Sequence, residues 1–176
     1  MFAQHIYRAQ RIDNGEWIKG FYVPEYCSHS YGKVAAILIT DEKCAPEQTI
    51  CIPVAPETAC MFTGLYDGTT FDELTEDEQL EFLENYQKED WHGRALFVGD
   101  VVTNEWCFSK SIAVIRFGKY RDLGMGDEYP QGHLGFYLDY FSPAEQTRFR
   151  KDILYYAGKC KKVGDAFYIA SIAKGV

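Results

Sequence analysis

The chain has 176 residues, of which 47% are hydrophobic and 16% aromatic, so we expect a folded, globular protein rather than a disordered one. Its formal net charge of −8 argues against non-specific binding to nucleic acid, whose phosphates require unpaired lysine and arginine. No apolar run is nearly as long as a membrane span, which needs about 20 residues, and residues 1–6 lack the basic and apolar regions of a signal peptide. We therefore expect a cytoplasmic protein without membrane association.

The first predicted element is a β-hairpin over residues 7–23. Asn14 and Gly15 both tolerate the positive φ angles of a type I′ turn, and aromatic and β-branched residues flank them. A two-residue turn at this dipeptide places Arg8 opposite Phe21 on one face of the ribbon. We therefore expect a cation–π contact between the Arg8 guanidinium and the Phe21 ring.

Short apolar runs, alternation with a period of two and bounding turn residues predict six further strands. These cover residues 34–39, 49–54, 95–102, 112–117, 134–141 and 163–172. Pro53 donates no backbone hydrogen bond, so the second of these strands should lie at a sheet edge or end there. The fifth has a core-facing row that consists of Leu134, Phe136, Leu138 and Tyr140.

Gly99 interrupts the apolar run of residues 95–102. A glycine inside a strand indicates a bulge or a close approach of the backbone. We expect Asp100, the next residue, to accept backbone N–H bonds at this break in the ladder. This is a structural role for a carboxylate rather than a catalytic one.

A capping box at Ser142–Glu145, with proline at the first helical position, predicts a helix over residues 143–157. Phe149, Ile153 and Tyr156 recur on one face of this helix. The lysines and arginines around it form the most basic neighbourhood of the chain.

A second capping box, Thr75–Glu78, predicts a helix that extends to about residue 90. We expect its apolar residues, led by Leu80 and Leu83, to pack on a sheet. Residues 72–90 contain nine acidic residues and one basic residue, a net charge of −8. Because the whole chain also has a net charge of −8, the remainder is balanced, and all the excess charge is confined to this element.

The cysteines and histidines have no metal-binding spacing. The six cysteines are Cys27, Cys44, Cys51, Cys60, Cys107 and Cys160. No two of them are separated by two residues as in a zinc knuckle, and no two histidines are four residues apart. We therefore predict no metal site, no cofactor and reduced thiols in a reducing cytosol.

These elements predict a mainly β chain of the β-rich α+β class. Short strands and many turn residues suit a small SH3/OB-like barrel or bent antiparallel sheets, with two short helices. The predicted organisation is an N-terminal barrel-like lobe over residues 1–118, with an acidic helical insertion at 70–92. A C-terminal β/α lobe over residues 119–176 is predicted to pack on it.

Three segments resemble the YopX-type proteins of phages and prophages. Residues 7–23 are similar to the opening "yRAxxxdnGxWxxGyyv" of that family, residues 55–67 to "xPeTxxxfTGLxD", and residues 97–102 to its "x-GDxV" strand. The chain departs from the family in the long stretch 68–96 and in residues 159–176, which have no clear counterpart. The resemblance implies an accessory protein with no established reaction.

The interpretation that we favour is therefore a non-enzymatic interaction or assembly module that acts with a host or phage protein, or as a homo-oligomer. A basic partner would be attracted to acidic side chains of the 75–90 helix, of which we single out Glu76, Asp77, Glu81 and Glu84. A solvated helix that only keeps the protein soluble is the simpler explanation of the same charges.

Two other functions are alternatives. A small barrel could bind nucleic acid through a stacking and basic surface, for which the candidates are Tyr7, Arg8, Arg11, Trp17, Lys19, Phe21 and Tyr22. An enzyme acting on nucleotides or nucleic acid would use carboxylates such as Asp67 and Asp100, with a metal ion. No sequence pattern supplies either aspartate with a catalytic partner.

Overall fold

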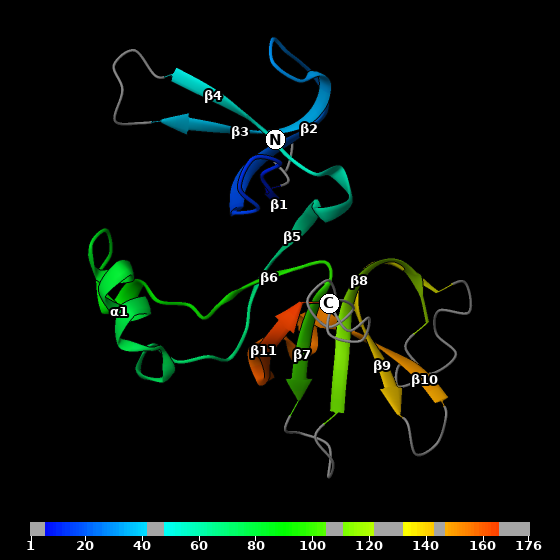
Figure 1. Cartoon of the computed structure of the whole chain (residues 1–176). Helices are drawn as coiled ribbons and strands as arrows, with labels where there is room; N and C mark the ends of the chain where they lie inside the picture. Colours follow the sequence, from blue (N-terminus) through cyan, green and yellow to red (C-terminus); the bar gives the residue numbers. More distant parts are fainter. Residues whose placement is uncertain (1–5, 42–47, 105–110, 122–131, 143–146, 166–176) are drawn as a thin grey trace, which may run out of the picture. The chain divides into compact units, whose positions relative to one another are not determined.

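Strands dominate the chain, and they form antiparallel sheets in each of two compact units (Figure 1). The computed structural model describes residues 6–41, 48–104, 111–121, 132–142 and 147–165. The two units are residues 1–62 and 63–176. The sequence had instead suggested a boundary after residue 118, which would cut β8 (Ser111–Tyr120), a strand that pairs with a neighbour on each side.

The sheet of the first unit has the strand order β4-β3-β2-β1-β5. Its strands are β1 (Ile6–Gln10), β2 (Trp17–Ser28), β3 (Gly32–Asp41), β4 (Gln48–Pro53) and the first residues of β5 (Cys60–Tyr66). A 3₁₀ turn, η1 (Pro56–Thr58), connects the last two. The core of this unit is formed by Ala9, Ala35, Ile37 and Val54.

The sheet of the second unit has the order β10-β9-β8-β7-β11. Its strands are β7 (Asp100–Asn104), β8, β9 (His133–Ser142), β10 (Thr147–Asp152) and β11 (Cys160–Asp165). β6 (Ala95–Phe97) lies beside β5. The described helices of this unit are α1 (Glu76–Leu83) and α2 (Ile153–Tyr156), and its 3₁₀ turns are η2 (Phe71–Glu73), η3 (Lys88–Asp90) and η5 (Ala157–Lys159). Leu96, Val102, Ile115, Leu138 and Ile153 are central to its core.

The mainly β class is confirmed, in the form of open antiparallel sheets rather than a closed barrel. β4 lies at the edge of the first sheet, and β10 and β11 lie at the two edges of the second. The edge position of β4, which ends at Pro53, agrees with the prediction made from that proline. In the part of the chain that is described, no helix combines the length and apolar character needed to cross a membrane.

The predicted hairpin is present, but its register is shifted by two residues. Instead of a two-residue turn, the six residues 11–16 connect β1 and β2. Hydrogen bonds from Arg11 N to Glu16 O (2.9 Å) and from Gly15 N to Arg11 O (3.1 Å) close this loop. Asn14 Oδ1 accepts the Glu16 N–H at 3.0 Å, and Gly15 has a φ of +74°. These local bonds stabilise a longer loop. A shift of two preserves the face of each side chain, which is why the alternation was predicted correctly.

The shifted register changes the partner of Arg8. Arg8 lies opposite Lys19, not Phe21, and its guanidinium lies 4.9 Å from the centre of the Trp17 ring. The predicted contact with Phe21 is therefore wrong. Arg8 instead contacts the ring of Trp17, which lies four residues nearer to the turn than Phe21.

The break at Gly99 is confirmed. Gly99 has a φ of +91°, it separates β6 from β7, and its N–H bonds to Ile115 O at 2.9 Å. The Asp100 carboxylate accepts the Phe97 N–H at 2.9 Å, as expected for an aspartate at a break in a ladder.

The prediction of a helix over residues 143–157 is wrong for most of the residues of this range that the structure describes. Residues 147–152 form β10, which pairs with β9 from Thr147 opposite Ser142 to Asp152 opposite Tyr137. The capping residues 143–146 lie outside the described ranges. Among the described residues of this range, helical structure begins only after Asp152, whose side chain accepts the Leu154 N–H at 2.8 Å; α2 is followed directly by η5. Tertiary pairing with β9 therefore overrides the local helical pattern.

The predicted core row of β9 is correct only over its second half. Leu138 and Tyr140 are buried, whereas Leu134 is 77% exposed. The last predicted strand, 163–172, begins earlier, at Cys160, and residues 166–172 lie outside the described part.

Candidate functional site

α1 is the most distinctive surface element, and it begins as the sequence predicts. Thr75 Oγ1 accepts the Glu78 N–H at 3.3 Å, and Glu78 Oε2 accepts the Thr75 N–H at 2.9 Å, so the capping box is complete. The Thr75 N–H, followed by the Thr75 hydroxyl, donates to the Glu78 carboxylate and lowers its pKa more than the ion pair with Arg94 does. The helix ends at Leu83, earlier than the predicted limit near residue 90, and η3 follows it.

The 68–94 segment, which carries α1, has a small aromatic core of its own. The Phe82 ring centre lies 5.9 Å from that of Phe71 and 5.2 Å from that of Trp91. Leu80 and Leu83, by contrast, are 65% and 47% exposed. The predicted packing of the two leucines on a sheet is therefore wrong, because Phe82 supplies the buried contact of the helix.

The residues of α1 divide into two faces. At about 100° per residue, Glu78, Gln79 and Phe82 lie on one side of the helix. On this inward face, Glu78 bonds to Arg94, Gln79 donates to the Leu74 carbonyl, and Phe82 packs in the aromatic core. The outward face of α1 consists of Glu76, Asp77, Leu80, Glu81, Leu83 and Glu84, all of them exposed.

Seven of the nine acidic residues of the 68–94 segment fall into two groups. Three make ion pairs: Asp72 with Lys88, Glu73 with Lys161, and Glu78 with Arg94. The four predicted interaction residues are the acids of the outward face, Glu76, Asp77, Glu81 and Glu84, and none makes an ion pair with a described residue. The structure thus separates acids that hold the segment together from acids that face outward.

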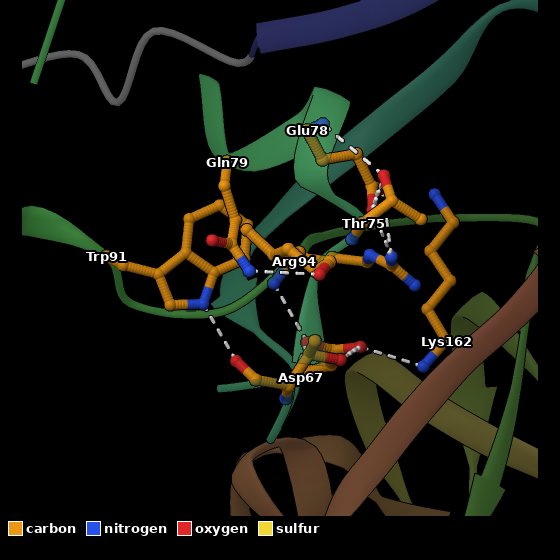
Figure 2. Close-up of polar contacts among 9 residues, drawn as sticks. Asp67, Thr75, Glu78, Gln79, Trp91, Arg94 and Lys162 are labelled. Atoms are coloured by element: carbon orange, nitrogen blue, oxygen red, sulfur yellow. Dashed lines mark hydrogen bonds and ion pairs between the residues drawn. The ribbon is translucent and has the colours of Figure 1, made fainter. Parts of the chain in front are cut away.

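The two ends of the 68–94 segment meet at a neck formed by Asp67, Gly68, Gly93 and Arg94. Figure 2 shows Asp67 beside Arg94 and Lys162. Asp67 is only 3% exposed, and its carboxylate accepts four hydrogen bonds. Oδ1 accepts the N–H groups of Thr69 (3.0 Å) and Arg94 (2.8 Å). Oδ2 accepts the Thr69 hydroxyl (2.8 Å) and the Lys162 N–H (2.8 Å). One carboxylate therefore joins both ends of the segment to β11.

The backbone of the neck is closely packed. The Asp67 N–H donates to Arg94 O at 3.0 Å, and the Gly68 N–H donates to Cys160 O at 2.8 Å. Gly93 has a φ of +106°, and a Cβ atom there would lie 2.1 Å from the Asp67 carbonyl oxygen. Only glycine fits at this position, for reasons of both backbone conformation and space.

Lys162 connects the two aspartates that were candidates for a catalytic pair. Its backbone N–H donates to Asp67, and its ammonium lies 3.1 Å from Oδ2 of Asp100, which is completely buried. Both carboxylates are thus engaged by donors of this chain. Within the described ranges, no three histidine, cysteine, aspartate or glutamate side chains lie close enough together to hold a metal ion.

Cys160 lies beside this network, and burial raises the pKa of its thiol to about 12, with a further contribution from the Asp67 carboxylate. Its Sγ–H donates to Ala157 O at 3.1 Å. The thiol is therefore protonated at neutral pH and serves as part of the core rather than as a nucleophile. Among the described cysteines, Cys27, Cys51, Cys60 and Cys160 are all reduced.

The predicted stacking and basic surface is divided by the sheet of the first unit. Tyr7 and Tyr22 pack against its core, with ring centres 5.3 Å apart. Trp17, Lys19 and Phe21 are exposed and share the other face, because the pairing places them opposite Gln10, Arg8 and Ile6.

Two of the three predicted basic residues of this surface are engaged locally. Arg8 is 7% exposed beside the Trp17 ring, and Arg11 pairs with Asp13. Lys19 is the only one of the three predicted bases with an exposed side chain. The surface is therefore more aromatic than basic, which suits phosphate binding poorly.

Glu73 makes the attachment of the 68–94 segment sensitive to acid. Its hydrogen bond to the Lys161 ammonium, followed by that to the Thr70 N–H, lowers its pKa from 4.5 to about 2. The folded protein therefore takes up this proton less readily than the unfolded chain. The stabilising contribution is complete above pH 4.5 and is lost as the pH falls through about 2.

Replacing Glu73 with glutamine should lower stability at neutral pH and flatten its dependence on acid between pH 4.5 and about 2. Urea unfolding of the wild type and of E73Q across this range would measure both effects. The two stability curves should converge at the acid end. Parallel curves would contradict the assigned ion pair.

Comparison of the chain with protein-family models, with curated proteins and with solved structures finds no match in any of the three.

Proposed function

We propose that this chain is a non-enzymatic interaction module that binds a basic protein partner through the outward face of α1. The observation that carries the proposal is the division of the acidic residues. Asp72, Glu73 and Glu78 are paired with Lys88, Lys161 and Arg94. The outward acids have no such role in the fold, so their charge is available to a partner.

The arrangement of the segment supports presentation of this face. Side-chain contacts of Phe71, Phe82 and Trp91 hold α1 in place from within, and the neck closes the segment at both ends. The outward face is thereby displayed on a preformed helix. A preformed helix loses less conformational entropy on binding than a disordered acidic tail would lose.

The outward face also has an apolar component. Leu80 and Leu83 are three residues apart, a spacing that aligns side chains along one helix face, and Tyr86 nearby is 60% exposed. A helix of this kind fits an apolar groove bordered by lysine and arginine. The similarity of residues 7–23, 55–67 and 97–102 to phage and prophage proteins supports a host or phage protein as the partner.

The test is the triple variant E76Q/E81Q/E84Q, used as bait in a bacterial lysate beside the wild type. We expect the wild type to retain basic proteins that the variant does not retain. Raising the salt concentration from about 0.1 M to about 1 M should release them, because ions screen exposed charges. Quantitative mass spectrometry of the bound proteins measures the difference.

The matched control is E16Q/E25Q/E57Q, which removes the same number of exposed glutamates from the first unit. This control should retain the same proteins as the wild type. If both triple variants lose the bound proteins equally, net charge rather than the outward face of α1 governs binding. If neither variant loses them, the proposal is wrong.

A further inference from the structure

The neck of the 68–94 segment covers an edge strand. β11 lies at one edge of its sheet and pairs with β7 on its inner side. On its other side, Cys160 O accepts the Gly68 N–H, and the Lys162 N–H donates to Asp67. Residues two apart in a strand direct their backbone groups to the same side. The neck therefore satisfies consecutive outward groups of β11, in the place where another strand would otherwise pair.

A side-chain contact extends this cover. Lys161, between these two residues, forms the ion pair with Glu73 of η2. Three successive residues of β11 thus contact the 68–94 segment or its neck. The Asp67 carboxylate bonds to Thr69 at one end of the segment, to Arg94 at the other and to Lys162 of β11, so these contacts share one acceptor group.

We propose that the 68–94 segment is a hinged cover for the outer edge of β11, and that it opens and closes as one unit about its neck. Gly68 and Gly93 are the hinge residues. Inside the segment, the aromatic core and the capping boxes involve only its own residues, so its internal structure persists when the neck opens. Opening exposes the edge of β11 and detaches α1 in a single step. The inference goes beyond the proposed function, since it holds whether or not α1 binds a partner.

The cover has a direct consequence for binding. A polypeptide strand that adds to the edge of β11 competes with Gly68 and Asp67 for the same backbone groups. Strand addition and closure of the segment therefore exclude each other. Occupation of the β11 edge would change the position of the outward face of α1.

Hydrogen exchange of the isolated protein, followed at single amides by NMR, tests the proposal. In the wild type, the amides of Thr69, Arg94 and Lys162 should exchange through one common opening, at the same free energy. The variant D67N should accelerate the exchange of all three amides together by about tenfold or more. Each Asp67 oxygen accepts two hydrogen bonds, and in asparagine an NH₂ group, which cannot accept them, replaces one of these oxygens. The amides of the β8–β9 ladder should remain better protected than these three amides, because they exchange only when the whole unit unfolds.

D77N is the matched control, since it makes the same chemical change on the outward face of α1, and it should leave all three rates unchanged. If D67N does not fold, G93A opens the neck by another route and leaves the carboxylate intact. It should accelerate the same three amides. The proposal is overturned if the Lys162 amide keeps its rate while Thr69 and Arg94 accelerate, or if the three wild-type amides give different free energies of opening. Because no partner is present, these outcomes are independent of the binding experiment.

Discussion

Replacement of Asp67 with alanine should lower the free energy of unfolding of the second unit by about 3–5 kcal/mol. The substitution removes the acceptor of four hydrogen bonds at a site that is 3% exposed. Three backbone N–H groups and one hydroxyl then lose their partner in a closely packed neck, and buried donors without a partner are costly. Urea denaturation of D67A and the wild type would measure the difference.

The control for this prediction is D77A, which makes the same substitution at an exposed aspartate of the same segment. Because Asp77 has no partner among the described residues, its replacement should change stability by less than about 0.5 kcal/mol. Equal effects of the two substitutions would show that the Asp67 carboxylate does not hold the neck.

Replacement of Gly93 with alanine should destabilise the second unit by about 3 kcal/mol, through two separate causes. A φ of +106° is strained for any residue with a side chain, and the added Cβ would lie 2.1 Å from the Asp67 carbonyl oxygen. The oxygen belongs to the backbone, so the contact can be relieved only by opening of the neck. Thermal or urea unfolding of G93A is the measurement.

Gly64 allows the two causes to be separated. It also has a positive φ, +80°, but a Cβ atom there would meet no other atom within 4 Å. We therefore expect G64A to cost about 1 kcal/mol, which is the conformational cost alone. The additional loss in G93A then measures the close approach. If G93A is no less stable than G64A, the neck is looser than its geometry indicates.

Features that depend on neighbouring residues in the sequence were predicted well. The capping box Thr75–Glu78, the strand end at Pro53 and the break at Gly99–Asp100 all depend on hydrogen bonds or steric limits within a few residues. The mainly β class likewise follows from period-two alternation. For such features the sequence contains both partners of the interaction that decides the structure.

Features that depend on distant pairing were predicted poorly. Residues 147–152 have a helical pattern of apolar residues, yet they form β10, because β9 satisfies their backbone. In the hairpin, the bonds of Asn14 and Gly15 to their neighbours favour a longer loop, which moves Arg8 away from Phe21. In α1, the leucines were expected inside, but the partners of Phe82, at Phe71 and Trp91, decide which face is buried.

The anchors of the candidate site were not identified from the sequence. Asp67 and Asp100 were recognised as notable carboxylates, but nothing in the local pattern indicates that Lys162 contacts both. A detectable signal was the sequence Asp67-Gly68-Thr69, since aspartate commonly bonds to a backbone N–H two residues later in turns. This signal predicts the first of the four hydrogen bonds and none of the others.

The amino-acid sequence by itself determined that the excess negative charge of this protein lies in one helical segment, because charge is a sum over residues and does not depend on their positions in space. Only the tertiary structure decided which of those charges are structural. Lys161 and Arg94 lie far from Glu73 and Glu78 along the chain, and folding brings them together. The outward acids therefore differ from Glu73 and Glu78 because folding brings a basic partner to those two residues and not to the outward acids, and this is a property of the fold.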